Sequence, residues 1–235
     1  MTRLLKVFFV SLFLFLSASP FSFAADLSIE DIASNLQVNQ SKIKDMYCEM
    51  NTTIKQGTGT PMTQSAKMWT KGEDKSRMEM ITPMKQTIIR NGNKSAIIDS
   101  NGQKTVSDVN ASTKGNMGGQ SKVDIEKFKE TFDLKVKATD DGYIIEGTPK
   151  EKTQFLGKME IYVDGKNWVS TKILIYDSHD KVITQTQIDY KEISGVLVPV
   201  KSLTESKMMG MNMTIEVKFE DVKVNQGIEG GVFKL

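Results

Sequence analysis

The sequence predicts a mainly β protein with a few α-helices, built on a single large, curved antiparallel sheet that coils into a partial barrel. Apolar and polar side chains alternate in segment after segment from residue 46 to residue 219, as they do in half-buried strands. Gly-rich and Asn-rich turns separate the segments, and only two stretches have helical spacing. Because a long sheet rarely stays flat, we expect it to curl and to bury its apolar face against those helices.

The N-terminus has the features of an export signal. Basic residues precede an apolar run at 7–16. The segment that ends at Ala24 has the small residues that are typical of a signal-peptidase cleavage site. The run is about half of the roughly 20 apolar residues that a spanning helix needs, which disfavours an uncleaved anchor. We therefore expect a signal peptide at 1–24, cleaved near Ala24/Ala25, and a single domain at 25–235.

Charge excludes two classes of partner. Arg3 and Lys6 are the only charged side chains of the signal, so its removal lowers the 31 Lys and Arg to 29, equal to the 29 Asp and Glu. A balanced chain without a basic block lacks the electrostatic footprint of a nucleic-acid binder. It also lacks a polybasic segment for anionic membranes. We expect a soluble monomer that does not bind nucleic acid.

The first element of the exported chain is expected to be a helix. Ser28 stands three residues before Asp31, as in a capping box, and Ile32 and Leu36 follow at helical spacing, which predicts an amphipathic helix that ends near Lys44. The apolar period then changes to two. Strands are predicted at 45–55, 64–71, 75–80, 86–91, 94–99 and 104–108, with hairpin turns at Asn91-Gly92-Asn93 and Asn101-Gly102.

The second half of the chain repeats this pattern after an interruption. A polar, Gly-rich loop is predicted at 110–120, followed by a short helix at 121–131 that lies over the sheet. Strands are predicted at 132–138, 143–148, 158–163, 172–176, 182–190, 196–205 and 211–224. In the last strand the odd positions from Met209 to Phe219 are apolar, which assigns them to one face.

No residue is predicted to be catalytic, and no cofactor is expected. The single histidine, His179, lies between Ser178 and Asp180 in a turn, where three adjacent residues cannot form a catalytic triad. The chain has no Cys/His spacing for a metal site and no phosphate-binding glycine loop. Cys48 is the only cysteine, and its apolar surroundings indicate a buried thiol.

Methionine is the one unusual component, with 14 in the chain. A run of methionines at 208–213 would suit copper(I), which prefers thioether ligands, so a Met-rich copper(I)-binding protein is an alternative. However, the same face continues into other apolar residues, which favours a deformable cavity for apolar ligands. The expected lining is Met68, Met78, Met80, Ile98, Leu134, Val136, Met159, Ile161, Ile173, Met209, Met211, Met213 and Ile215.

Several segments resemble those of one family of binding proteins. They are the Lys67-Met68-Trp69-Thr70-Lys71 strand, the hairpin at Asn91-Gly92, the strand at 158–164 and the segment 188–199. In this order, with the N-terminal helix, the chain resembles the periplasmic lipoprotein carriers, the LolA/LolB-like and outer-membrane lipoprotein-sorting proteins. The resemblance implies an unclosed β-barrel lidded by helices, whose apolar interior holds lipoprotein acyl chains or another lipid in the periplasm.

The resemblance also implies partners, and the chain departs from the family pattern at one point. The partners would be an inner-membrane donor and an outer-membrane acceptor, and no enzymatic activity is implied. The best-known carriers have an arginine soon after the Trp-x-Lys stretch that helps to hold the lid closed, whereas here Gly72 follows Lys71 and Arg77 lies further along. A role as an envelope-stress sensor of lipids or lipoproteins is a second alternative.

Overall fold

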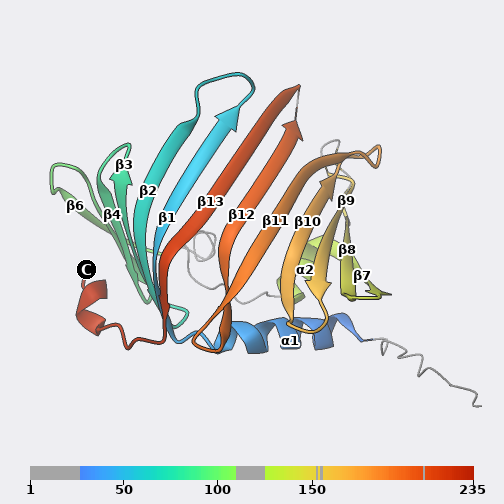
Figure 1. Ribbon diagram of the computed structural model, residues 1–235, viewed down its shortest axis with the longest axis horizontal. Helices are drawn as coiled ribbons and strands as arrows, with labels where there is room; N and C mark the ends of the chain where they lie inside the picture. The colour runs from blue at the N-terminus through green and yellow to red at the C-terminus, as the bar shows by residue number, and fades with distance from the viewer. Residues whose placement is uncertain (1–26, 110–124, 152, 154–155, 209) are drawn as a thin grey trace, which may run out of the picture.

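The computed structural model describes residues 27–109, 125–151, 153, 156–208 and 210–235, and its strands form one antiparallel sheet. The order across the sheet is β6-β5-β4-β3-β2-β1-β13-β12-β11-β10-β9-β8-β7 (Figure 1). The strands are β1 Asp45–Gln56, β2 Met62–Lys71, β3 Lys75–Thr82, β4 Gln86–Asn91, β5 Lys94–Ile98, β6 Lys104–Asp108, β7 Phe132–Thr139, β8 Gly142–Pro149, β9 Lys158–Asp164, β10 Val169–Tyr176, β11 Val182–Ile193, β12 Val196–Met208 and β13 Met211–Val224.

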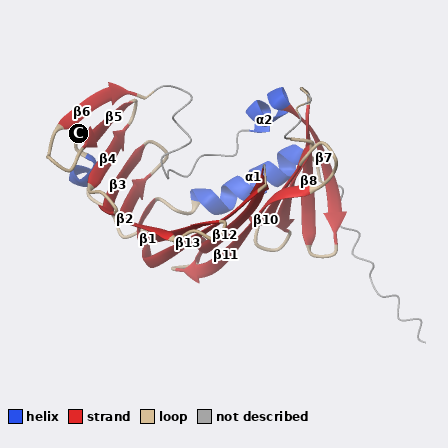
Figure 2. Cartoon of the chain, turned by 90° about the horizontal axis from the view of Figure 1, so that it is seen from above, coloured by secondary structure: helices blue, strands red, loops and turns tan. Residues whose placement is uncertain are grey.

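The sheet is strongly curved and stays open. Consecutive strands pair with each other except β6 and β7, and β1 pairs with β13, so the first and last strands meet in the middle. The edge strands β6 and β7 end at opposite sides of the curve and do not pair with each other (Figure 2). This arrangement confirms the predicted fold class: mainly β, with few helices and a sheet not closed into a barrel.

Helix α1 (Ile29–Ser41) begins at the predicted cap. The Ser28 hydroxyl accepts the Asp31 amide at 3.1 Å, and the Asp31 carboxylate accepts the Ser28 amide in return. The helix ends three residues before the predicted Lys44. There Asn225, beyond the last strand, accepts the Lys44 amide and donates to the Lys42 carbonyl, which turns the chain into β1.

The apolar face of α1 lies on the concave face of the sheet. Ile32 and Leu36 are buried in one cluster with Tyr143 and Ile145 of β8 and with Val163 of β9. The second helix, α2 (Ile125–Thr131), lies beside α1 at the same side of the sheet (Figure 2). An ion pair between Lys129 and Glu30 connects the two helices.

The register assigns whole rows of side chains to the concave face. Because paired residues in an antiparallel sheet point to the same side, the row through the buried Ile145 can be followed across eight strands. It consists of Ile54, Ile215, Thr204, Thr186, Ile173, Ile161, Ile145 and Val136.

The C-terminal residues cover the other, convex face near β1–β4. Arg77 lies on this face, because its neighbour Met78 belongs to the concave side, and its guanidinium donates to the Val232 carbonyl. Lys71 donates to the Ile228 carbonyl at 2.6 Å, and Phe233, in the short 3-10 helix η2 (Gly230–Phe233), is completely buried. The chain therefore has a second core on the opposite face.

The predicted elements correspond closely to the observed ones. Gly92 and Gly102 adopt the positive φ values expected of the two hairpin turns. Strand β10 begins at Val169, three residues before the predicted start at 172. The predicted loop at 110–120 and the first part of the predicted helix at 121–131 lie outside the described residues.

Candidate functional site

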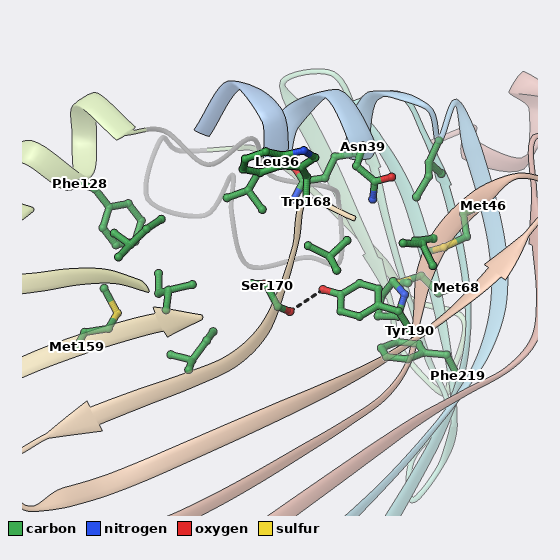
Figure 3. A pocket seen from close by; sticks show the side chains of 18 of the residues that line it. Leu36, Asn39, Met46, Met68, Phe128, Met159, Trp168, Ser170, Tyr190 and Phe219 are labelled. Carbon is green, nitrogen blue, oxygen red and sulfur yellow. Dashed lines mark hydrogen bonds between the residues drawn. The ribbon is translucent and has the colours of Figure 1, made fainter. Parts of the chain in front are cut away.

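A cavity of about 660 Å³ lies between α1, α2 and the concave face, and nearly all of its lining is apolar (Figure 3). This volume is within the range of ordinary small-molecule sites. Its lining consists of Leu36, Asn39, Gln40, Ile43, Met46, Met50, Met68, Met78, Phe128, Leu134, Ile145, Met159, Ile161, Trp168, Val169, Ser170, Ile173, Tyr190, Leu197, Pro199 and Phe219.

One wall of the cavity is built by branched aliphatic residues of β7–β10. Ile161 and Ile173 are directly paired, so their side chains stand next to each other on the concave face. Gly147 is buried behind Leu134 and Met159, and a Cβ atom there would stand 3.3 Å from Leu134 Cδ2. The absence of a side chain at Gly147 therefore leaves room for the two lining residues beside it.

The opposite wall is built by methionines. Met46 and Met50 of β1 are on the same face as Met68 of β2 and Met78 of β3, and all four line the cavity. Methionine has an unbranched, rotatable side chain and a polarizable sulfur, so this wall can adapt to the shape of an apolar ligand. The cavity thus has one stiff wall and one deformable wall.

Few polar groups face the cavity. Tyr190 donates its hydroxyl to the Ser170 carbonyl at 3.0 Å (Figure 3), and burial raises the pKa of this tyrosine, so it stays protonated. Further along β11 and β12 the concave face is lined by hydroxyls, with Thr186 bonded to Thr204 at 3.0 Å. The apolar surface therefore ends where these hydroxyls begin.

The structure brings together part of the predicted lining. Six of the thirteen predicted residues line this cavity: Met68, Met78, Leu134, Met159, Ile161 and Ile173. Val136 is on the same face but packs against the cluster beneath α1, and Met80 pairs with Ala66 on the concave face without lining the cavity. Whether the six lining residues bind a ligand stays a prediction.

The predicted residues of β13 lie away from the cavity. Met213 is in the same row as Met159, and Ile215 in the same row as Ile161, yet the members of these rows that line the cavity belong to β7–β10 and not to β13. The cavity crosses the rows obliquely, as expected where a straight helix covers a twisted sheet. Met211 is 55% exposed, and Met209 lies outside the described residues.

Ile98 requires a correction. Its neighbour Ile97 pairs with Ile88, which pairs with the cavity residue Met78, so Ile98 itself points to the convex face. Two adjacent isoleucines occur in this strand, and an alternation pattern cannot decide which of them faces the cavity.

Sequence reasoning missed several residues that complete the cavity. Phe219 was assigned to the correct face, and Leu36 and Ile43 to the helix, but none was predicted to line a cavity. Trp168 lies in the turn before β10 with a φ of 53°, and stacks on Tyr143 at a centroid distance of 5.6 Å. No periodic signal marks a turn residue that folds back over a sheet.

The structure also places the metal-ligating and nucleophilic side chains of its described residues. No group of three or more His, Cys, Asp or Glu side chains among them is placed to hold a metal ion. Cys48 is completely buried, and burial raises the pKa of its thiol to about 12. His179 lies in a turn, where the Asp177 carboxylate accepts its backbone amide at 2.9 Å. No helix in the described part of the chain is long and apolar enough to cross a membrane.

The open thirteen-stranded sheet with helices over its concave face is a LolA-like fold. A LolA superfamily protein from Nitrosomonas europaea superposes with a TM-score of 0.61 at 12% identity, over 89% of this chain and 98% of that one. A DUF1329 family protein from Desulfovibrio piger superposes with a TM-score of 0.60 at 17% identity, over 87% and 95%. A putative outer membrane lipoprotein-sorting protein domain from Vibrio parahaemolyticus gives 0.57 at 13% identity, over 86% and 95%.

At the level of sequence, a family model described as an uncharacterized protein family matches residues 104–235, more than half of the chain. The chain belongs to that family. No curated protein matches it. The solved structures establish the fold, and the cavity has to be interpreted from its own residues.

Proposed function

We propose that this protein is a periplasmic binding and carrier protein that holds lipid acyl chains in the cavity beneath α1 and transports them toward the outer membrane. The apolar cavity of about 660 Å³ is the single observation that carries the proposal. Each buried methylene contributes about 0.8 kcal/mol, so partial enclosure of one chain is enough for useful affinity. The cargo would be the acyl chains of a lipoprotein or another lipid, and no catalytic step is proposed.

The LolA-like fold and the name of the Vibrio parahaemolyticus domain support the direction of transport. An inner-membrane donor and an outer-membrane acceptor would then be the partners. The lid would not be held as in the best-known carriers, since Arg77 bonds to Glu79 and to the Val232 carbonyl on the convex face. Opening of α1 would instead depend on its apolar contacts with β8 and β9.

Native mass spectrometry of the protein, purified from a periplasm without detergent, tests the proposal together with uptake of a fluorescent fatty acid. We expect a releasable lipid or acylated adduct and saturable uptake. In the variant Met50→Trp a large ring enters the cavity, so uptake should fall about tenfold or more, a loss of about 1.4 kcal/mol. Met62→Trp makes the same substitution at an exposed position and should bind as the wild type does. No adduct and no uptake would contradict the proposal.

Copper(I) binding is a second candidate because of one observation. Met211 and Met213 lie at the exposed end of β13, on alternate positions, with 55% and 36% of their surface accessible. Thioether sulfurs suit copper(I). Stoichiometric copper(I) binding that disappears in Met211→Leu/Met213→Leu would support this function, whereas unchanged binding would exclude these two sulfurs as the ligands.

A further inference from the structure

A second, polar pocket of about 240 Å³ adjoins the apolar cavity. It lies where the C-terminal half of α1 meets the β9–β10 turn and the β11–β12 turn. Asn39, Trp168 and Leu197 line both the apolar cavity and this pocket. The two spaces therefore adjoin at these three side chains.

Asn39 is the key residue of this boundary. It is 8% exposed, and its carboxamide makes no hydrogen bond with any part of the chain that the structure describes. Figure 3 shows its side chain pointing from α1 toward the cavity. The carboxamide is open to the two spaces that it lines, so its donor and acceptor are available to a ligand group at the boundary between an apolar and a polar space.

The polar pocket carries only a small net positive charge. Lys42 and Lys166 contribute two positive charges, Glu192 contributes one negative charge, and Asn35 and Asn167 contribute carboxamides. The C-terminus of α1 adds the equivalent of about half a negative charge near Lys42. Hydrogen-bonding groups rather than net charge thus dominate the pocket, which suits a hydroxyl-bearing head.

We propose that one acylated polyol lipid occupies both spaces, with its tail in the apolar cavity, its ester linkage at Asn39 and its uncharged head in the polar pocket. This inference rests on the proposed function, because it names the class and the orientation of the lipid in the same cavity. The Asn39 amide donates to the ester carbonyl, and its oxygen accepts from a head hydroxyl. Trp168 and Leu197 enclose the point where the tail becomes the head.

Two ligands with the same tail test the assignment: a monoacylglycerol and the methyl ester of the same fatty acid. Asn35 lines only the polar pocket, so Asn35→Trp should weaken monoacylglycerol binding about fivefold and leave the methyl ester unchanged. Ser34→Trp, the neighbouring exposed position on α1, is the matched control and should change neither. Asn39→Leu should weaken monoacylglycerol binding by a similar factor, because it removes hydrogen bonds to the ligand.

The outcomes separate this inference from the proposed function. If the wild type takes up both ligands and Asn35→Trp changes neither, the head does not enter the polar pocket and the inference is wrong while the carrier function stands. If a lysophospholipid with the same tail binds more than about tenfold tighter than the monoacylglycerol, the assignment of an uncharged head to the polar pocket is wrong. If the wild type binds none of these lipids, the proposed function fails as well.

Discussion

The two arms of the sheet differ in how their faces are covered. In the arm built from β7–β10, α1 covers the concave face and leaves a cavity beneath it. In the arm built from β2–β5, the C-terminal residues cover the convex face, and Phe233 and Ile89 are almost completely buried. The first arm therefore has a cavity on its concave face, whereas the second arm is also covered on its convex face.

This difference in packing predicts different consequences of mutation. A well-packed core loses both transfer free energy and packing when a side chain is truncated, whereas a wall that already faces a cavity loses fewer contacts. The covering of the second arm should thus determine global stability. The covering of the first arm should determine ligand binding.

The largest effect is expected for Phe233→Ala, which empties the C-terminal core. We expect a loss of about 4 kcal/mol in the free energy of unfolding, measured by urea denaturation, because a fully buried ring is removed. Fatty-acid uptake by the remaining folded protein should not change. Lys234→Ala, at the exposed neighbouring position, is the control. A loss of uptake without a loss of stability would contradict the division between the arms.

Ile32→Ala should affect the other arm. Ile32 is completely buried beneath α1 with Tyr143 and Ile145, so its truncation should cost about 3 kcal/mol. Amide hydrogen exchange should rise in α1 while β2–β4 stay protected, and fatty-acid uptake should weaken. Val38→Ala, at a position of the same helix that is 55% exposed, should behave as the wild type. An equal rise in amide hydrogen exchange in both arms would show that the two arms do not open independently.

A smaller effect is expected from the cap of α1. Ser28→Ala removes the hydroxyl that accepts the Asp31 amide, and such a loss costs about 1 kcal/mol. The thermal midpoint should fall slightly, and exchange should rise only in the first turn of α1. Ser34→Ala, at an exposed position in the middle of the helix, should have no such effect.

The sequence predicts the helix and the strands of the two arms, but it does not predict how the second arm is covered. The capping box at Ser28 and the period-two pattern predict α1 and the strands, because both depend on residues a few positions apart. The C-terminal cover was not predicted. It depends on contacts such as Arg77 with the Val232 carbonyl, which join residues 155 positions apart and carry no periodic signal.

The candidate site was predicted only in part, because a sequence pattern reports on neighbouring residues and not on contacts between distant elements. Alternation assigns a side chain to a face, and this correctly groups Met68 with Met78 and Ile161 with Ile173. Alternation does not say where along a strand the covering helix lies. The oblique course of the cavity, which excludes Ile215, arises from the twist of the folded sheet.

The smallest expected effect comes from two aspartates that shape turns. Asp164 accepts the amides of Lys166 and Asn167 in the turn that leads to Trp168, and Asp177 accepts the amides of His179 and Lys181 in a turn away from the cavity. Burial alone would raise the pKa of Asp164, but hydrogen bonds from the turn outweigh burial and lower it. Backbone hydrogen bonds likewise lower the pKa of Asp177.

Because both pKa values are lowered on folding, each ionised carboxylate stabilises the fold above its unfolded pKa of about 4, and this stabilisation disappears as the pH falls through the folded value. The difference in urea midpoint between the wild type and either Asp→Asn variant should therefore shrink from pH 7 to pH 3. Only Asp164→Asn should also weaken fatty-acid uptake, by about twofold or about 0.4 kcal/mol, because its turn positions Trp168 at the cavity. Equal uptake by the two variants would mean that fatty-acid binding does not depend on the turn that positions Trp168.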